Sequence, residues 1–535
     1  MTKKTFTILI SISILLIGIT IGFFLNNFLI DENVSEGSKK FNEVLSYTQK
    51  YYYQDVDTKD LVDDAINGML HDLDPHSVYI PPTDQMHIEE EFRGNFEGIG
   101  IEFQINNDTI NVVSPITGGP SESVGIEAGD RIIKINNKNC IGFTNKDVVK
   151  NLRGEKGTKV NVTVYRPFQK KKLNFEIIRD QIPIYTVDAA IMVSDSIGYI
   201  SLSKFAETSM FEVKQSLEKL SKLGMRKLIF DLRNNPGGYL EQAFQIADLF
   251  IDQNKLIVFT RGRISSLDDN LNAEKTYPYE KIPVVILINR GSASASEIVS
   301  GAIQDWDRGI LVGETSFGKG LVQRPFILED SSAVRITISK YFTPSGRAIQ
   351  RDYKNKEDYY NEIMNREESE GENINHKLEA DSAKEIFYTS GGRKVIGGGG
   401  ITPDFIVKNE ELSDYSIHLR SQNIYYKFAR KFIDANSELN EKFKNNFKLF
   451  KNEFSFSNND MKSFVKFAEE NGVKFSNQDF IKDEEFIKAR LKAHIAKNFW
   501  NNNGWYSVLL DVDDQFGKAK ELLQKNYQLQ LLQKK

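Results

Sequence analysis

The spacing of apolar residues divides the chain into segments with different predicted structures. Residues 5–25 carry no charge and are mostly apolar, and about 20 such residues are the length that a membrane-spanning helix needs. Residues 38–73 place apolar side chains at helical intervals. Three prolines, Pro75, Pro81 and Pro82, then favour an extended segment. The pattern predicts an N-terminal span (1–30) followed by a helical segment (31–91).

The charges around the first span predict its orientation. Lys3 and Lys4 precede it, which places the start of the chain in the cytoplasm and the residues after Asp31 outside. The alternative is a cleaved signal peptide, whose apolar region is shorter and ends in an A-x-A-like site that residues 18–20 imitate poorly. We expect an uncleaved anchor in a bacterial inner membrane with the rest of the chain in the periplasm, and either alternative exports that part.

Short strands punctuated by glycine follow between residues 92 and 182. Their apolar alternation falls on residues 96–105, 108–116, 130–138, 159–166 and 172–178. One short helix is predicted within 120–129. A second begins at Thr144, because Thr144 and Asp147 have the spacing of a capping box.

This order of strands and helices resembles a PDZ domain, and the plainer alternative is a small β-domain with a glycine turn. In a PDZ domain, the backbone N–H groups of Gly98, Ile99, Gly100 and Ile101 would cradle a terminal carboxylate. The peptide that carries this carboxylate would add a strand to the exposed edge of the sheet.

From residue 183 to 410, strands alternate with helices. Apolar runs predict strands at 198–205, 226–233, 283–290 and 309–314, and helical spacing predicts helices at 208–223, 239–251 and 294–306. Such alternation is typical of an α/β core with buried parallel strands. Residues 331–342 add an alternating strand.

Two further segments complete the predicted domains. Residues 352–384 are acidic and polar with little apolar periodicity, which predicts a solvated insertion or hairpin within the core. From residue 411 to 535, aromatic residues such as Tyr425, Phe428 and Phe432 recur at helical spacing and predict a separate helical domain. Its aromatic stripe is more typical of a hydrophobic core than of a ligand site.

Composition excludes several classes of function. The 535 residues carry 69 basic and 74 acidic groups, a net charge of -5, which argues against nucleic-acid binding. The single cysteine, Cys140, allows no intrachain disulfide. Six scattered histidines match no zinc or haem spacing. We therefore expect no metal and no cofactor.

The run "NRGSASASEI" at 289–298 holds a candidate nucleophile. It lies where a buried strand is predicted to turn into a helix, and α/β folds place their ligands at such strand ends. A serine there has an exposed hydroxyl, with the next N–H at a helix N-terminus where an oxyanion would form. The plainer alternative is a serine that caps the helix.

The base that would activate this serine is not a histidine, because none occurs between His87 and His376. Lys319 is a candidate, since Gly318 and Gly320 let its backbone approach another element closely. A lysine in a water-poor pocket is shifted toward its neutral form and can then accept a proton. A surface lysine on a glycine-rich turn is the plainer alternative.

Together with these segments, several motifs resemble the carboxy-terminal processing peptidases, also called tail-specific proteases. Over residues 41–407 they are, in order, "LDPHSVYIPP", the PDZ-like segment, "DLRNNPGG", "GSASASEI", "GETSFGKGLVQ", "YFTPSGRAIQ" and "GGGGITPD". The resemblance implies a crotonase/ClpP-like α/β protease core that uses a Ser–Lys pair, with an inserted PDZ domain that receives the substrate tail.

The resemblance also implies roles for individual residues. The nucleophile falls on Ser294, the general base on Lys319, and the residue that orients this lysine on Gln323. The oxyanion donors would be the N–H groups of Ala295 and Gly238. Three more positions match ones tied to activity in the family, and an ion-pair network around the crevice is their alternative role: Asp231, Arg233 and Glu297.

The expected partners are protein substrates with free apolar C-terminal tails, the membrane, and a second copy of the chain through the N-terminal helices. An adaptor or regulator that delivers substrate is left open. Two rival functions remain. Ser316 and Lys319 form an S-x-x-K motif like that of penicillin-binding proteins, and Ser316→Ala would then matter more than Ser294→Ala. The other rival is an anchored PDZ scaffold that binds tails without cutting them.

Overall fold

The protein is described by a computed structural model that covers residues 32–353, 356–378, 385–409, 411–436 and 438–527. The predicted anchor, residues 5–25, lies outside these ranges. Within them, no helix combines the length and the apolar character that crossing a bilayer requires. The chain divides into two compact units, Met1–Ile80 and Pro81–Lys535, and each is described by itself.

The first unit contains the predicted helical segment as two helices, α2 (Glu32–Tyr51) and α3 (Thr58–His71). The Asp57 side chain caps α3 by accepting the N–H of Lys59. Asp74 then holds a turn by accepting the N–H groups of His76 and Ser77. A short strand, β1 (Val78–Ile80), follows, so the extended segment predicted near the prolines is present.

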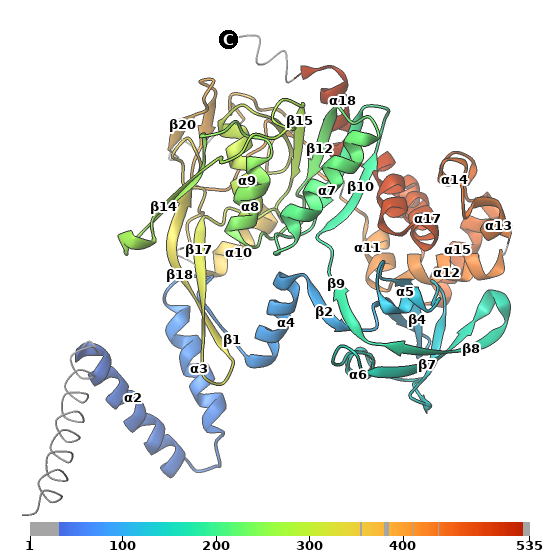
Figure 1. Cartoon of the computed structure of the whole chain (residues 1–535), viewed down its shortest axis with the longest axis horizontal. Helices are drawn as coiled ribbons and strands as arrows, with labels where there is room; N and C mark the ends of the chain where they lie inside the picture. The colour runs from blue at the N-terminus through green and yellow to red at the C-terminus, as the bar shows by residue number, and fades with distance from the viewer. Residues whose placement is uncertain (1–31, 354–355, 379–384, 410, 437, 528–535) are drawn as a thin grey trace, which may run out of the picture. The chain divides into compact units, whose positions relative to one another are not determined.

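A seven-stranded sheet forms the centre of the second unit (Figure 1). Its strands, in spatial order, are β10 (Val187–Met192), β11 (Ile197–Leu202), β12 (Lys227–Asp231), β15 (Val284–Ile288), β16 (Ile310–Gly313), β22 (Phe405–Ile406) and β19 (Gly371–Glu372). The pairs from β11 to β22 are parallel, while β10 and β19 join the two edges antiparallel. The predicted α/β core with buried parallel strands is confirmed.

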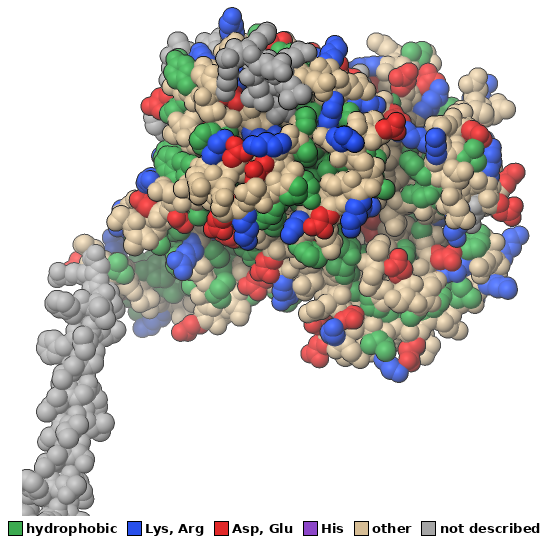
Figure 2. Space-filling view, turned by 45° about the horizontal axis from the view of Figure 1, so that its top comes forward, with side chains coloured by type: hydrophobic (Ala, Val, Ile, Leu, Met, Phe, Trp, Pro, Cys, Tyr) green, Lys and Arg blue, Asp and Glu red, His purple; other side chains and the backbone are tan. Residues whose placement is uncertain are grey.

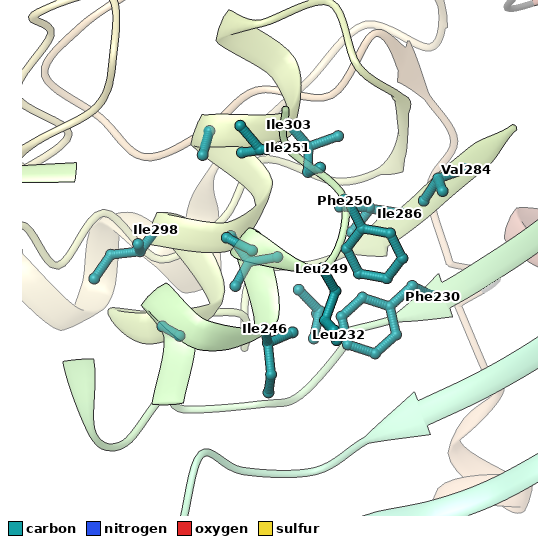
Figure 3. Packing of buried hydrophobic residues seen from close by; sticks show 14 of the residues in the cluster. Phe230, Leu232, Ile246, Leu249, Phe250, Ile251, Val284, Ile286, Ile298 and Ile303 are labelled. Atoms are coloured by element: carbon teal, nitrogen blue, oxygen red, sulfur yellow. The ribbon is translucent and has the colours of Figure 1, made fainter. Parts of the chain in front are cut away.

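Helices cover one face of this sheet, namely α7 (Ser209–Lys222), α8 (Leu240–Asp248) and α9 (Ala295–Asp305). Figure 3 shows how Phe230 of β12 and Ile286 of β15 pack beneath these helices, against Phe250 and Ile303. This cluster is the largest apolar core of the described residues. Its burial fixes α9 to the sheet, and α9 begins directly after Ser294.

A second, antiparallel sheet contains the predicted strand 331–342 as β18. In this sheet β18 (Ala333–Phe342) pairs with both β17 (Leu321–Ile327) and β13 (Leu256–Gly262), and β13 pairs with β14 (Asp269–Asn272). The strands β13 and β17 were not predicted, because their apolar alternation is short. β17 begins two residues after Lys319.

The PDZ domain is inserted between β2 (Asn95–Gly98) and β9 (Asp180–Pro183), which pair antiparallel where the chain enters and leaves it. Its sheet has the order β3 (Ile101–Asn106), β4 (Thr109–Pro115), β5 (Arg131–Ile135), β7 (Lys159–Arg166) and β8 (Lys171–Ile178), and β6 (Lys138–Asn139) pairs with β5. The helices α5 (Pro120–Ser123) and α6 (Asn145–Leu152) complete it. Thr144 and Asp147 form the predicted capping box at the start of α6.

The C-terminal segment is helical, as predicted. It contains α11 (Asp414–Ser421), α12 (Ile424–Ala435), α13 (Glu438–Phe443), α14 (Phe447–Glu453), α15 (Asn458–Glu470), α16 (Asn477–Lys482), α17 (Glu484–Leu509) and α18 (Asp514–Gln524). The predicted aromatic stripe packs as core, with Tyr425 and Phe428 against Phe464.

This segment is not wholly separate from the protease core, in contrast to the prediction. Phe516 and Leu523 of α18 pack on the second face of the central sheet, against residues such as Tyr199 and Val285. A parallel sheet needs cover on both faces. Nothing in the local pattern of α18 indicates which surface it covers, so only the tertiary structure assigns it this place.

The prediction of a solvated insertion at 352–384 is wrong in part. Residues 356–365 form α10 (Lys356–Asn365), and its Tyr359 and Ile363 are buried. Farther along, β19 completes an edge of the central sheet. The apolar residues here are too few to produce a periodic signal, yet several of them, such as Tyr359, Ile363 and Ile374, are buried.

The surface carries both signs of charge. In Figure 2, Lys and Arg side chains alternate with Asp and Glu side chains over the visible face, with green apolar side chains scattered between them. This pattern agrees with the near balance of 69 basic and 74 acidic residues.

Candidate active site

The three serines of the 289–298 run occupy different environments. Ser292 and Ser296 are fully buried, and their hydroxyls donate to the carbonyls of Leu232 and Asn235 at 2.8 and 2.9 Å. Ser294 is only partly buried and lines a cavity of about 550 Å³. It is therefore the serine of this run that a substrate can reach.

The backbone of Ser294 has an unusual conformation, with φ 54° and ψ -112°. A side chain is rarely accommodated at this positive φ, and such a residue costs about 1–3 kcal/mol. The strand β15 ends six residues earlier and α9 starts at Ala295. The turn between them thus holds the Ser294 side chain at the carboxyl end of the sheet, where ligands of α/β folds bind.

The "DLRNNPGG" loop interlocks with this turn. Asn234 and Asn289 bind each other, because the Asn234 N–H and the Asn289 side-chain amide each donate to the partner's side-chain oxygen, at 2.8 and 3.0 Å. Gly237 lies so close that a Cβ on it would meet the Ser294 Cβ at 2.8 Å. Any other residue at 237 would push the serine out of place.

Two N–H groups at this junction lack an acceptor within the described part of the chain. The Gly237 N–H donates to Asn235, whereas the N–H groups of Gly238 and Ala295 make no hydrogen bond with described residues. Gly238 and Ala295 both line the cavity beside Ser294. Such a pair of backbone donors can stabilise an oxyanion.

Glu297 joins the serine turn to the lysine loop. Its buried carboxylate accepts the N–H groups of Ser294, Gly318 and Lys319 at 2.8, 2.7 and 2.9 Å, and also the Ser316 hydroxyl. One carboxylate therefore fixes the backbones of both candidate catalytic residues. Glu297 does not line the cavity.

Tyr341 of β18 adds a second link between the same two residues. Its hydroxyl donates to the backbone carbonyls of Ser294, at 3.0 Å, and Lys319, at 2.5 Å. Burial raises the pKa of the Tyr341 hydroxyl, so it stays protonated and remains a donor. The pattern of the strand gave no sign of this role.

The glycines around Lys319 have the role that their positions predict. A Cβ on Gly318 would lie 2.5 Å from the Arg351 Cγ, and one on Gly320 would lie 2.8 Å from the Gln350 N. The backbone of the loop therefore packs closely against residues 350 and 351. Lys319 itself is partly buried and lines the cavity with Ser294.

Gln323, the third residue of β17, also lines the cavity. Its side-chain amide N–H donates to the Thr337 hydroxyl at 3.3 Å. The cavity thus brings together five of the residues implied by the sequence: Ser294, Ala295, Lys319, Gln323 and Gly238.

Asp231 and Arg233 lie elsewhere. Asp231 accepts the Tyr199 hydroxyl at 2.7 Å and pairs with Arg233, whose guanidinium also binds Asp513 and Gln515 near α18. Neither residue lines the cavity. This arrangement is the ion-pair network that was the alternative, and it ties the C-terminal segment to the end of β12.

The predicted peptide-binding residues of the PDZ domain form the turn between β2 and β3. Gly98 ends β2, Ile101 begins β3, and Gly100 between them has a φ of 73° that favours glycine. Because β3 is the edge strand of its sheet, its outer side can pair with an added strand.

Ser316 cannot act as the nucleophile of an S-x-x-K motif in this conformation. It is fully buried, donates to Glu297 at 2.5 Å and accepts the Ile401 N–H at 2.6 Å. Ser316→Ala is still expected to affect the site, because this change removes a hydrogen bond from the carboxylate that holds both loops.

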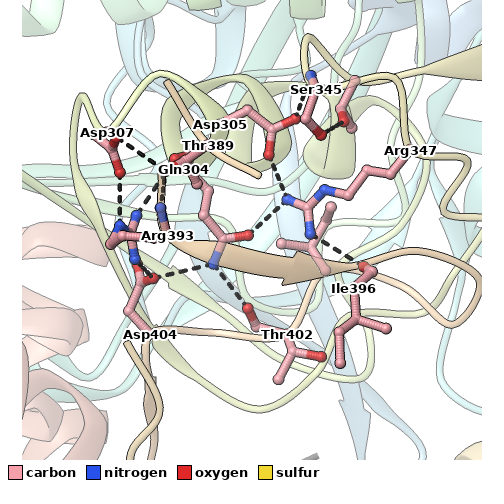
Figure 4. Close-up of polar contacts among 12 residues, drawn as sticks. Gln304, Asp305, Asp307, Ser345, Arg347, Thr389, Arg393, Ile396, Thr402 and Asp404 are labelled. Carbon is pink, nitrogen blue, oxygen red and sulfur yellow. Dashed lines mark hydrogen bonds and ion pairs between the residues drawn. The ribbon is translucent and has the colours of Figure 1, made fainter. Parts of the chain in front are cut away.

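Residues of the motifs "YFTPSGRAIQ" and "GGGGITPD" contact the C-terminal end of α9 (Figure 4). The buried Arg347 donates to Gln304 and pairs with Asp305 at the end of this helix. Arg393 pairs with Asp307 and Asp404. These paired charges hold the C-terminal end of α9 in place. Because α9 begins at the residue after Ser294, they also help to position that serine.

One wall of the cavity comes from α4 (Pro82–Arg93), at the end of the predicted helical segment and directly after the prolines that were expected to favour extension, and it contributes Ile88, Glu89 and Phe92. Proline at the first position of a helix is favourable, so Pro82 starts α4 instead of extending the chain. The other missed lining residues include Tyr239, Arg335 and Tyr341.

The buried Glu297 predicts a pH-dependent stability. Burial raises the pKa of its carboxyl from 4.5 to about 6, against the hydrogen bonds that favour the charged form. The folded state therefore binds the proton more tightly than the unfolded state, and the resulting stability is present below pH 4.5 and lost as the pH rises through about 6.

We expect the free energy of unfolding of the wild type, measured relative to Glu297→Gln by urea denaturation, to fall by about 2 kcal/mol between about pH 4 and about pH 7. The variant cannot titrate at this position, so the other ionisable groups cancel in the difference. A difference that stays constant or rises with pH would contradict the prediction.

Comparison with known proteins identifies the family. Residues 196–359 match the model of peptidase family S41, residues 112–166 that of a PDZ domain, and residues 27–83 that of the activating protease CtpB N-terminal domain. Residues 415–501 match a family of unknown function.

Individual relatives carry the same description. The carboxy-terminal-processing protease of Bartonella bacilliformis is 38% identical over 324 residues, which is 60% of this chain and 74% of that protein. The carboxy-terminal processing protease CtpA of Bacillus subtilis is 37% identical over 330 residues, 61% of this chain and 70% of that protein.

Among solved structures, the photosystem II D1 C-terminal processing protease is 29% identical, with a TM-score of 0.33, and the alignment covers 58% of this chain and 83% of that one. The peptide-bound PDZ domain of the Vibrio cholerae carboxy-terminal protease is 33% identical, with a TM-score of 0.16, over 16% of this chain and 97% of that one. From its matches to the family models and to the curated relatives, the chain belongs to the carboxy-terminal processing peptidases.

Proposed function

We propose that the protein is a serine endopeptidase that cleaves other proteins near their C-termini, with Ser294 as nucleophile and Lys319 as general base. The observation that carries the proposal is the shared cavity, which Ser294, Lys319 and two backbone N–H donors without an acceptor in the described chain line together. A Ser–Lys pair needs no histidine, and none of the described histidines lines the cavity.

The reaction proceeds in two halves. The Ser294 hydroxyl attacks the scissile carbonyl carbon while neutral Lys319 takes its proton, and the oxygen that becomes negative accepts the N–H groups of Ala295 and Gly238. The C–N bond then breaks, and the leaving amine takes the proton from Lys319. Water attacks the acyl ester, Lys319 takes and returns a proton, and free Ser294 is restored.

The supporting residues position the base. We assign Gln323, whose side-chain amide N–H donates to Thr337, the role of orienting the Lys319 amine through its side-chain oxygen. Glu297 and Tyr341 hold the two backbones at a fixed separation. Because proximity and orientation supply much of the rate of such a reaction, these contacts matter although neither side chain takes part in it.

The PDZ domain supplies the preference for chain ends. We propose that the turn at Gly98–Ile101 binds the terminal carboxylate and that the tail adds a strand along β3. We further propose that residues 5–25 anchor the protein in a bacterial inner membrane, so that this domain and the cavity act in the periplasm. Exposed Phe41, Val44 and Tyr47 on α2 support contact with a second copy.

The test is incubation of the purified protein with a reporter protein that ends in an unstructured apolar tail, either free or amidated. We expect mass spectrometry to detect a shortened C-terminus on the free form, with cleavage of the amidated form slower by about 10-fold or more, since amidation removes a charge-assisted contact. A protein that binds the tail but never shortens it is a scaffold. Equal cleavage of both forms would place the selection of chain ends outside the PDZ domain.

A further inference from the structure

The cavity holds one cationic side chain besides Lys319, and its position sets it apart. Arg335 on β18 lines the cavity and lies on the same face of the strand as Thr337, two residues farther from Tyr341, whose hydroxyl contacts the Ser294 carbonyl. Opposite them on β17, Pro325 pairs with Arg335 and Gln323 with Thr337. Two residues along a strand span about 7 Å, so the guanidinium lies about one or two substrate residues beyond Gln323.

Arg335 has no carboxylate partner within the described part of the chain, and its guanidinium makes no hydrogen bond to a described residue there. Its surroundings are apolar for the most part, with Ile88 and Phe92 of α4 and Ile327 of β17 on the same cavity. Burial lowers the pKa of this guanidinium, with the nearby Tyr239 acting in the opposite sense.

Other arginines of comparable or deeper burial have carboxylate or carbonyl partners, unlike Arg335 among the described residues. Arg347 pairs with Asp305, and Arg393 pairs with Asp307 and Asp404. Arg308 instead donates to the backbone carbonyls of Phe250, Tyr279 and Ile282. A cation that is partly removed from water without such a partner is costly, and it gains most from an anion that arrives with a ligand.

Glu89, the other charged residue on this wall, does not neutralise Arg335. Its carboxylate accepts the side-chain N–H of Gln85 at 2.8 Å, and no ion pair joins it to Arg335 among the described residues. The cavity therefore offers a substrate the planar guanidinium of Arg335, which forms no salt bridge with a described residue.

We propose that Arg335 binds a carboxylate of the substrate close to the scissile bond, which makes it a specificity-determining residue. This inference rests on the proposed function. The carboxylate comes from either of two sources, an acidic side chain within about three residues of the cut or the terminal carboxylate of a short leaving tail. Both present the planar pair of oxygens that a guanidinium binds through two parallel N–H groups.

The experiment uses matched reporter tails that differ in one residue. A single Glu, or its Gln counterpart, is placed at each position from three residues before to three after the cleaved bond, and each tail is made with a free and an amidated end. We expect wild-type kcat/KM to favour Glu over Gln, or the free over the amidated end, by about 10- to 100-fold at one position. Arg335→Gln should reduce this ratio to about 1, and Arg335→Lys should retain part of it because it keeps the charge.

Arg324→Gln is the matched control. Arg324 lies on the neighbouring strand β17, is exposed, contacts the ring of Phe326 and does not line the cavity. It should leave the ratio at the wild-type value. If the free-end preference persists in Arg335→Gln while the Glu preference disappears, the carboxylate is that of a side chain and the chain end is recognised elsewhere.

Two results would overturn the inference: a wild type without any carboxylate preference, or an Arg335→Gln variant that slows Glu and Gln tails equally, as loss of a structural contact would. The same tails are also bound to Ser294→Ala and to the double variant Ser294→Ala/Arg335→Gln, with affinity read by fluorescence anisotropy. This measurement needs no turnover. Absence of cleavage would therefore refute the proposed function, while the binding ratio would still decide the role of Arg335.

Discussion

Replacement of Ser294 by alanine is expected to lower kcat for cleavage of a tailed substrate by a factor of about 10⁴ to 10⁶, because the attacking oxygen is lost while the rest of the site remains. Affinity for the tail should stay near the wild-type value, since the PDZ domain and the cavity walls are unchanged. The measurement is single-turnover cleavage followed by mass spectrometry, together with tail binding.

Ser300→Ala is the control for this change. Ser300 lies on the same helix, α9, and donates to the Ser296 carbonyl one turn earlier, but it does not line the cavity. Its replacement should leave kcat within about 3-fold of wild type, since it removes one local hydrogen bond. Substantial cleavage by Ser294→Ala would show that another residue is the nucleophile.

The strained backbone of Ser294 predicts a trade between stability and activity at the same position. At φ 54° and ψ -112°, glycine avoids the steric cost that serine and alanine share. Ser294→Gly should therefore be more stable than Ser294→Ala by about 1 kcal/mol in urea denaturation, while both are inactive. Equal stability would show that the conformation carries no strain.

Replacement of Glu297 by alanine is the second change with a large expected effect. It leaves the buried N–H groups of Ser294, Gly318 and Lys319 without their acceptor, and each such loss costs about 1 kcal/mol or more. We expect the free energy of unfolding to fall by about 3–5 kcal/mol. We also expect kcat to fall by at least about 100-fold at a temperature where the variant is folded, because the two loops lose their common anchor.

Two comparisons separate positioning from simple destabilisation. Glu297→Gln keeps the size of the side chain but turns one acceptor into a donor that faces N–H groups, so kcat should fall while KM changes little. Glu241→Ala removes an exposed carboxylate on α8, which among the described residues accepts a hydrogen bond from Gln245 alone, and should change neither stability nor kcat measurably. If Glu297→Gln retains wild-type kcat, the carboxylate does not hold the pair in place.

The strands of the central sheet could be predicted from the sequence because both of their faces are buried. Within the predicted strands 226–233 and 283–290, residues 228–230 and 284–288 are apolar without interruption, and helices with one apolar stripe lie between these strands. The strands β13 and β17 were missed because they belong to a smaller sheet with one exposed side, where the apolar signal is short.

For the site, local sequence predicted the groups but not the contacts that hold them. The strand-to-helix turn at Ser294 and the glycines around Lys319 depend on local backbone conformation, which neighbouring residues in the sequence indicate. The links from Glu297 to Lys319 and from Tyr341 to Ser294 span 20 or more positions, so they had no local signal, although Ser294 and Glu297 have the spacing of a capping box. The same is true of α4, which supplies a cavity wall from a segment where two prolines favoured extension.

The order of motifs along the chain determined the family, the α/β core with its inserted PDZ domain, and which serine and lysine to consider, because each depends on residues close together in sequence. Only the tertiary structure decided that Glu297 binds both loops, that α18 covers the second face of the sheet, and that Arg335 faces the cavity unpaired with any carboxylate of the described residues. These features depend on which surfaces meet after folding, and no local spacing records that.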